Sequence, residues 1–221
     1  MNRFAVWFVN LFYPAKCIFC GRLLPGDVPD CCDKCIHSLP EYDDADRTVQ
    51  YFDRTTALFY YRSPVREAIL SYKFHGTHSY ADVFARWMAA QIRVKFDGTY
   101  DLISWVPCSA RRRWSRGYDQ SRLLAERLGR ELGTEVRCTL RKVRHNRAQS
   151  GIGKEAERKA NVLGVYVAVD PSAVRGKRIL LVDDVLTTGA TISECGKILK
   201  LAGADSLSCA VIAAAKQDHD K

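Results

Sequence analysis

A run near the C-terminal end combines two acids with hydroxyl side chains and a glycine. It reads Asp183-Asp184-Val-Leu-Thr187-Thr188-Gly189-Ala190-Thr191 and follows four apolar residues, 179–182. Four apolar residues in a row predict a strand buried on both faces of a parallel sheet. Such sheets bind ligands beyond the carboxyl ends of their strands, and the N-terminus of the helix expected next favours a phosphate. We therefore predict a sugar-phosphate site, in which the acids accept hydrogen bonds from vicinal hydroxyls. A plain loop turn and a Mg²⁺ site of the response-regulator kind remain alternatives.

Cysteines near the N-terminal end have the spacing of metal ligands. Two C-x2-C pairs are separated by eleven residues: Cys17, Cys20, Cys32 and Cys35. Four thiolates on two such turns can converge on one tetrahedral zinc. No position is left open for substrate, so we predict a structural site that folds a segment too short to bury its own core. Cys31 or His37 could replace one ligand, and buried or disulfide-paired cysteines are the alternative to a metal.

The positive charge of the chain is concentrated in one stretch. Lys and Arg number 34 against 25 Asp and Glu, a net charge of +9, and residues 111–159 carry the whole excess. This favours an anionic partner such as a phosphate ester, nucleic acid or acidic lipid, although a solvated basic face is also possible. Trp105, Trp114 and Tyr118 could stack bases beside the basic side chains. The candidates for contact with a nucleic-acid backbone are Arg111, Arg112, Arg113, Arg144, Arg147, Lys154 and Arg158.

The composition describes a folded protein with one main domain and an appendage. Of 221 residues, 47% are hydrophobic and 27% charged, and no apolar run reaches the ~20 residues of a membrane span. We expect no integral membrane segment. Five clustered and four scattered cysteines favour reducing cytosol. The apolar N-terminus predicts an amphipathic helix ended by Pro14, and the domains are placed at 1–50 and 51–221.

The elements that must position these residues alternate between strands and helices. Strands are expected at 57–62, 101–106, 135–140, 179–182 and 207–215. Helices are expected at 83–94, over 123–132 with Gly133 as the stop, and over 192–202 with Gly203 as the stop. The alternation predicts an α/β fold with a mainly parallel sheet flanked by helices, preceded by a small zinc-binding segment with four cysteine ligands.

Residues 179–191 resemble the phosphoribosyl-diphosphate signature of type I phosphoribosyltransferases at every defining position. The resemblance implies that Asp183 and Asp184 bind the ribose 2′- and 3′-hydroxyls. It also implies that residues 184–191 wrap the 5′-phosphate, chiefly through Thr187, Thr188, Gly189 and Thr191. Mg²⁺ would bridge the ribose hydroxyls and the diphosphate.

Further motifs resemble the ComF family, including its GntX-like members, over essentially the whole chain. They follow the cysteine pairs in the order Val106-Pro107, Arg116-Gly117-Tyr118-Asp119-Gln120, Arg147-Ala148-Gln149 and Glu157-Arg158-Lys159-Ala160-Asn161-Val162. Asp119 departs from the family, which usually has Asn there. The resemblance implies a first crevice loop at 108–120, a closing loop at 143–162, and diphosphate contacts from Lys73, Arg116 and Gln120. For Lys73, a free surface lysine is the alternative.

Three functions are compatible with these residues. The ComF resemblance implies a phosphoribosyl-diphosphate-binding protein that handles single-stranded DNA during natural transformation. A phosphoribosyltransferase of nucleotide or purine metabolism ranks second, because no base-recognition set can be named and the N-terminal segment expected to cover the nucleobase carries the zinc ligands instead. Its catalytic residues are unknown. A non-enzymatic adaptor is the third, in which the zinc segment docks a DNA helicase through Phe19, Leu23 and Leu24. Packing of these three residues onto the main domain is the alternative.

Overall fold

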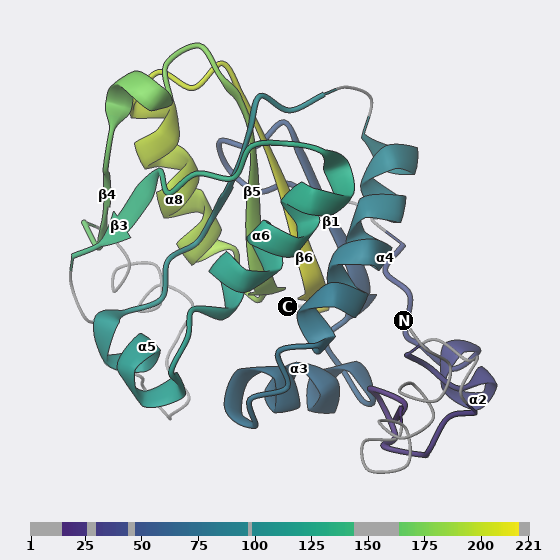
Figure 1. The fold of residues 1–221 in the computed structure, drawn as a ribbon. Helices are drawn as coiled ribbons and strands as arrows, with labels where there is room; N and C mark the ends of the chain where they lie inside the picture. The colour runs from purple at the N-terminus through teal and green to yellow at the C-terminus, as the bar shows by residue number, and fades with distance from the viewer. Residues whose placement is uncertain (1–14, 26–29, 44–46, 97–98, 144–163, 217–221) are drawn as a thin grey trace, which may run out of the picture.

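The computed structural model describes residues 15–25, 30–43, 47–96, 99–143 and 164–216 of the chain. A four-stranded parallel sheet forms its centre, in the order β1-β6-β5-β2 (Figure 1). The four strands are β1 (Arg54–Tyr60), β2 (Leu102–Trp105), β5 (Arg178–Leu186) and β6 (Ser206–Ala214). The α/β prediction with a mainly parallel sheet is confirmed.

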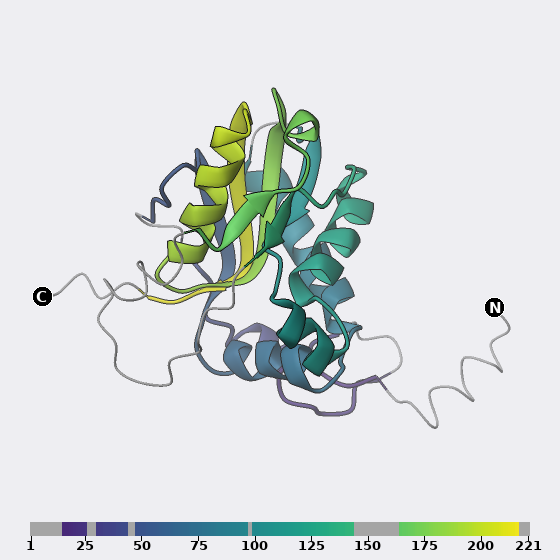
Figure 2. The ribbon, with the colours of Figure 1, turned by 90° about the vertical axis from the view of Figure 1, so that its left-hand side faces the viewer.

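Helices cover both faces of the sheet. α4 (Tyr80–Lys95) and α6 (Gln120–Leu132) pack on one face, and α8 (Ala190–Leu201) lies on the other (Figure 2). A separate antiparallel pair, β3 (Leu140–Lys142) with β4 (Tyr166–Ala168), packs beside α8. The remaining short elements are α2 (Asp33–Ile36), α3 (Val65–Phe74), α5 (Ala110–Arg116) and the 3-10 turn η1 (Pro171–Ala173).

The apolar run before the paired acids forms the middle of β5, as expected. Residues 179–182 are completely buried because β2 and β6 flank the strand and helices cover both faces. On α8, Ile192, Cys195 and Leu199 face this core, and Gly203 follows with a φ of 93°. The helix predicted at 192–202 and its glycine stop are therefore confirmed.

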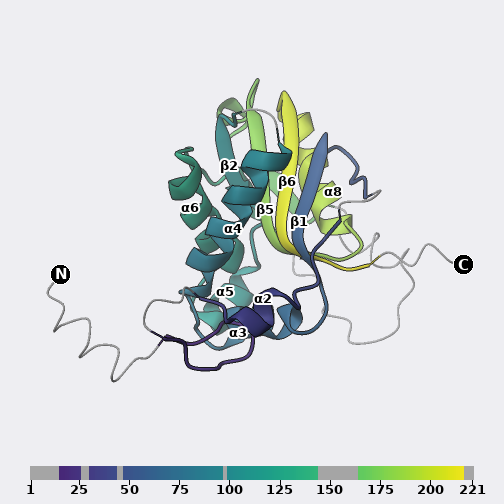
Figure 3. The ribbon, with the colours of Figure 1, turned by 90° about the vertical axis from the view of Figure 1, so that its right-hand side faces the viewer.

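The carboxyl ends of the strands point toward one end of the molecule. α3 and α5 lie at that end in every view, and so does the cysteine segment that contains α2 (Figures 1 and 3). The features for which sequence predicts chemistry thus gather at one edge of the sheet. No helix in the described ranges is both long enough and apolar enough to cross a lipid bilayer.

Two of the expected elements differ from the structure. The strand expected at 135–140 is wrong: Val136 makes one bridge to Ile103 of β2, and the next strand, β3, begins only at Leu140. The first crevice loop at 108–120 contains a helix, α5, because Ser109 caps it and Gly117 ends it with a φ of 80°. The helix expected before Pro14 lies outside the described residues.

Candidate functional site

The paired acids lie in the last third of β5, at the carboxyl edge of the sheet. Asp184 is 9% exposed, and its Oδ1 is 2.8 Å from the Nζ of Lys73. Lys73 reaches it from the last turn of α3. The structure therefore brings together two residues predicted for the same crevice from segments more than a hundred positions apart.

Asp183 is held by different partners. Its Oδ1 accepts a hydrogen bond from the Ser121 hydroxyl at 2.8 Å and one from the backbone N–H of Asp184 at 2.9 Å. Burial and the nearby charge of Asp184 raise the pKa of Asp183 to about 7, although Ser121, the backbone N–H and Lys73 oppose the shift. Asp183 is therefore poised to gain or lose a proton near neutral pH.

The hydroxyl-rich run forms a turn that leads directly into α8. Thr187 is exposed, and the next four residues are partly exposed. Gly189 has a φ of 81°, a conformation that glycine adopts without strain, and caps α8 at its N-terminal end. The Thr188 hydroxyl accepts from the N–H of Ala190 at 3.4 Å. The turn is open to solvent at a helix N-terminus, the arrangement that suits a phosphate.

Arg47 supports this turn, a contact that sequence reasoning missed. Its guanidinium donates to the carbonyl oxygens of Ala215, at 2.8 Å, and of Leu186, at 3.4 Å, and also to that of Thr187. Burial lowers the pKa of Arg47. No motif contains this arginine, so only its spatial position reveals that it fixes the start of the phosphate turn to the end of β6.

Lys73 and the other two diphosphate candidates belong to one connected group. Arg116 donates to Oε1 of Gln120 at 2.7 Å, and its guanidinium lies 4.5 Å from the ring centre of Phe74. Gln120 is 2% exposed, and its Nε2 has no hydrogen-bond partner among the described residues. The hydroxyl of Tyr72 donates to the carbonyl of Gln120 at 2.7 Å. The end of α3 is thus attached to the start of α6.

Asp119, the departure from the family pattern, caps α6. One of its carboxylate oxygens accepts from the N–H of Arg122 at 3.2 Å, and the other accepts from the N–H of Cys108 at 3.0 Å. Asn offers one acceptor oxygen in place of two. The buried carboxylate of Asp119 therefore links residue 108, before α5, to the first turn of α6.

Lys142, at the end of β3, is a second residue that sequence reasoning did not select. Its Nζ lies 5.3 Å from the ring centre of Tyr166 on the paired strand. Burial, together with the charge of Arg112, lowers the pKa of Lys142, and Asp183 opposes the shift. A partly buried ammonium thus lies within electrostatic range of the paired acids.

The basic helix α5 is almost fully exposed. Arg111, Arg112 and Arg113 are exposed, no residue of the helix is buried, and Trp114 is 89% exposed. Trp114 is therefore no core anchor. Of the other backbone candidates, Arg144, Arg147, Lys154 and Arg158 lie outside the described residues, as does nearly all of the expected closing loop.

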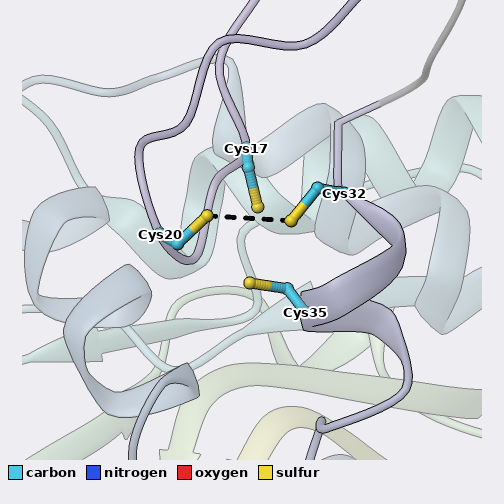
Figure 4. Close-up of side chains that lie close together, drawn as sticks. All are labelled: Cys17, Cys20, Cys32 and Cys35. Atoms are coloured by element: carbon cyan, nitrogen blue, oxygen red, sulfur yellow. Dashed lines mark hydrogen bonds between the residues drawn. The ribbon is translucent and has the colours of Figure 1, made fainter.

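Four cysteine thiols converge from two turns of the N-terminal segment (Figure 4). All four sulfur atoms lie within 4.8 Å of one another, in a group formed by Cys17, Cys20, Cys32 and Cys35. The sulfur atoms of Cys20 and Cys32 are 3.7 Å apart, close to the ~3.8 Å that tetrahedral geometry with Zn–S bonds of ~2.3 Å requires. The group can hold a metal such as zinc.

The two alternative metal ligands are not part of the group of four cysteines. Neither Cys31 nor His37 is among the clustered ligands of the described chain. Burial raises the pKa of Cys31 to about 12. For Cys17 burial acts in the same direction, but hydrogen bonds from the backbone of Cys32, Cys20 and Phe19 outweigh it and lower the pKa to about 6. None of the nine cysteines, all of which lie in the described ranges, forms a disulfide in this structure.

The cysteine segment packs on the main domain through aromatic contacts. The ring of Phe19 stacks on Trp87 of α4 with centres 6.0 Å apart and meets Phe59 of β1 edge-on at 6.2 Å. Phe19 and Leu24 are each 8% exposed, whereas Leu23 is 58% exposed. Of the two alternatives for these residues, packing onto the main domain holds for Phe19 and Leu24, and only Leu23 is exposed as a docking surface requires.

Comparison with known proteins finds relatives that align with most of this chain. Residues 119–221 match the family described as phosphoribosyl transferase domain. Competence protein F of Haemophilus influenzae is 28% identical over 220 residues, covering 89% of this chain and 95% of that protein. DNA utilization protein YhgH of Salmonella typhi is 30% identical over 194 residues, covering 85% and 79%. A solved structure of the allosteric regulatory enzyme of purine biosynthesis is 22% identical with a TM-score of 0.44, covering 64% of this chain and 29% of that one.

The family match and the architecture agree. The matched domain covers the paired acids and the phosphate turn, and the parallel sheet with flanking helices has the type I phosphoribosyltransferase fold. The cysteine group before the sheet completes the arrangement that the sequence motifs predict. Because two relatives align with most of their own lengths, the chain belongs to the ComF family.

Proposed function

We propose that this chain binds phosphoribosyl diphosphate and handles single-stranded DNA during DNA uptake, in the reducing cytosol. One observation supports the proposal above all others. The paired acids at the end of β5, the open turn at the N-terminus of α8 and the basic helix α5 all lie at the same edge of the sheet. The names of the two relatives, a competence protein and a DNA utilization protein, support the part of the proposal that concerns DNA uptake.

The sugar-phosphate part of the proposal assigns each group one task. Asp183 and Asp184 accept hydrogen bonds from the ribose hydroxyls. The N–H groups and hydroxyls of residues 187–191 surround the 5′-phosphate, where the helix dipole of α8 favours negative charge. Lys73, which contacts Asp184, and Arg116, which contacts Gln120, are assigned to the diphosphate.

The donor set also fits a magnesium ion that arrives with the ligand. Mg²⁺ prefers carboxylate oxygens together with substrate phosphates, and adjacent aspartates supply such oxygens at the edge of the sheet. When bound, the ion supplies positive charge to the diphosphate. Asp183 and Asp184 would hold it, directly or through the ribose hydroxyls.

The DNA part of the proposal is supported by charge and exposure. Three consecutive arginines and an exposed tryptophan on α5 offer cations for phosphates and a flat ring for a base. Cations that contact phosphates release counterions, so the affinity for single-stranded DNA should fall steeply with salt. An affinity that stays flat between low and physiological ionic strength contradicts this part.

A titration tests both parts together. Purified protein is titrated with labelled single-stranded DNA, with and without phosphoribosyl diphosphate and Mg²⁺, and the ligand itself is titrated by calorimetry. Replacing Asp183→Ala and Asp184→Ala together should abolish ligand binding, while the metal of the cysteine group is retained. Retained ligand affinity in the double variant refutes the site.

The control removes a negative charge far from the paired acids in sequence. Glu131→Gln changes an exposed acid on α6 and should leave both titrations unchanged. A panel of nucleobases and amines added to the same protein tests the transferase alternative. Rapid release of diphosphate with one acceptor would make the chain an active phosphoribosyltransferase.

A further inference from the structure

Lys73 forms an ion pair with one of the two acids of the proposed ribose site. Its Nζ is 2.8 Å from Oδ1 of Asp184, and the two side chains are 18% and 13% exposed. An ion pair that is shielded to this degree is weakened little by salt. The ammonium of Lys73 therefore lies in the position that a metal cation attracted by Asp184 would take.

The backbone around Lys73 is held, but its side chain is long enough to move. Tyr72 is completely buried, its hydroxyl binds the carbonyl of Gln120, and its own carbonyl accepts from Tyr118. On the other side, Phe74 lies beneath the guanidinium of Arg116. The flexible four-carbon stem of lysine can swing the ammonium without moving α3.

We infer that Lys73 is the counter-ion of Asp184 in the ligand-free protein, where it prevents a divalent cation from binding without the ligand. When a diphosphate binds, the ammonium of Lys73 moves from Asp184 to the diphosphate. This inference rests on the proposed function, whose ligand carries the diphosphate. It adds that metal and ligand enter together.

The charges of the site support this order of events. Two adjacent carboxylates would attract a divalent cation strongly, but Lys73 cancels one negative charge at contact distance. Mg²⁺ dehydrates reluctantly and binds best where substrate phosphates join the carboxylates. A diphosphate supplies oxygen ligands for the metal cation. It also supplies an acceptor for Lys73, because an ammonium binds phosphate oxygens as a point charge.

Binding of Mn²⁺ alone, measured by electron paramagnetic resonance, tests the inference without any enzymatic readout. Wild-type protein should bind Mn²⁺ weakly at this site. Lys73→Gln should bind it about tenfold more tightly or better, because a positive charge in contact with a carboxylate has been removed. The gained site should vanish when Asp184→Asn is added to Lys73→Gln, which separates it from metal bound by the cysteines.

Lys73→Arg is the matched control, because it keeps the charge and should keep Mn²⁺ binding weak. Equal Mn²⁺ affinity in wild type and Lys73→Gln overturns the inference, and so does a Lys73→Arg variant that binds Mn²⁺ like Lys73→Gln. Lys73→Met gives a second neutral variant with an apolar side chain, and it should gain Mn²⁺ in the same way.

The ligand arm separates this inference from the proposed function. Calorimetry with phosphoribosyl diphosphate and Mg²⁺ should show binding to wild type and weaker binding to Lys73→Gln, which lacks the cation that joins the diphosphate. If wild type binds no ligand while Lys73→Gln still gains Mn²⁺, the proposed function fails and the pairing of Lys73 with Asp184 stands. If wild type binds the ligand and Lys73→Gln gains no Mn²⁺, the role of Lys73 as counter-ion fails and the proposed function stands.

Discussion

Asp183 and Asp184 are adjacent in the chain, yet their surroundings give them different properties. Successive residues of a strand point to opposite faces, so Asp184 meets Lys73 on one side and Asp183 meets Ser121 and a backbone N–H. An ammonium balances the charge of Asp184, whereas burial raises the pKa of Asp183 to about 7. One acid is therefore paired with a lysine, and the other takes up a proton near neutral pH.

The raised pKa of Asp183 predicts how stability depends on pH. An ordinary aspartate in the unfolded chain has a pKa near 3.8, so between pH 4 and 7 the folded protein binds more protons than the unfolded one. Its free energy of unfolding therefore falls as pH rises through this window, by up to about 1.4 kcal/mol per pH unit from this group. Denaturant unfolding from pH 4 to 8 should show this slope in wild type and lose it in Asp183→Asn. A slope equal in both proteins contradicts the assignment.

At the scale of an element, α5 is built to tolerate changes on its surface. Its ends are fixed by the Ser109 cap, with the hydroxyl 3.3 Å from the N–H of Arg112, and by Gly117. No side chain of the helix belongs to the core. Binding and stability can therefore be separated by substitution here.

Substitutions on α5 should weaken DNA binding without destabilising the fold. We expect Trp114→Ala to cost about 1–3 kcal/mol of single-strand affinity if a base stacks there. Arg112→Gln with Arg113→Gln should reduce the salt slope by about 0.7 for each phosphate that is no longer neutralised. Fluorescence anisotropy over a salt series measures both effects, with thermal unfolding as the check on stability. Arg130→Gln, an exposed arginine in the last turn of α6, should change neither. An equal loss per removed charge in the α5 arginine variant and in Arg130→Gln would show a general charge effect, and an unchanged affinity in Trp114→Ala would exclude stacking there; either result contradicts a site on α5.

The same elements show which parts of the fold and of the candidate site can be predicted from the sequence. The four apolar residues before Asp183 and the face of α8 were readable, because burial on a sheet or helix follows a fixed period. The helix inside 108–120 was missed, since three consecutive arginines and a serine give no apolar period. Arg47 was missed for another reason: its partners are backbone carbonyls of distant strands, and such contacts leave no pattern in the chain.

At the scale of the molecule, the cysteine group and the main domain are joined by one hydrophobic cluster. The buried cysteines, Phe19 and residues of α4 and β1 belong to it together. Spacing alone predicted the group of four, because two C-x2-C turns constrain the sulfur positions locally. Its attachment through Phe19 and Leu24 could not be predicted, since an apolar side chain beside a metal turn suits an interface and an exposed surface equally.

Loss of the metal should therefore destabilise the whole protein. Cys17→Ser removes one ligand, and because metal binding in such a short segment is largely its folding free energy, we expect a loss of several kcal/mol in unfolding free energy. Phe19 would then leave Trp87, so acrylamide should quench more of the tryptophan fluorescence. Metal analysis, thermal unfolding and the soluble fraction measure the outcome. Cys31→Ser is the matched control, since Cys31 lies beside the group without belonging to it, and it should retain the metal. A Cys17→Ser protein that is metal-free and unfolds at the wild-type temperature would show that the group does not hold the fold together.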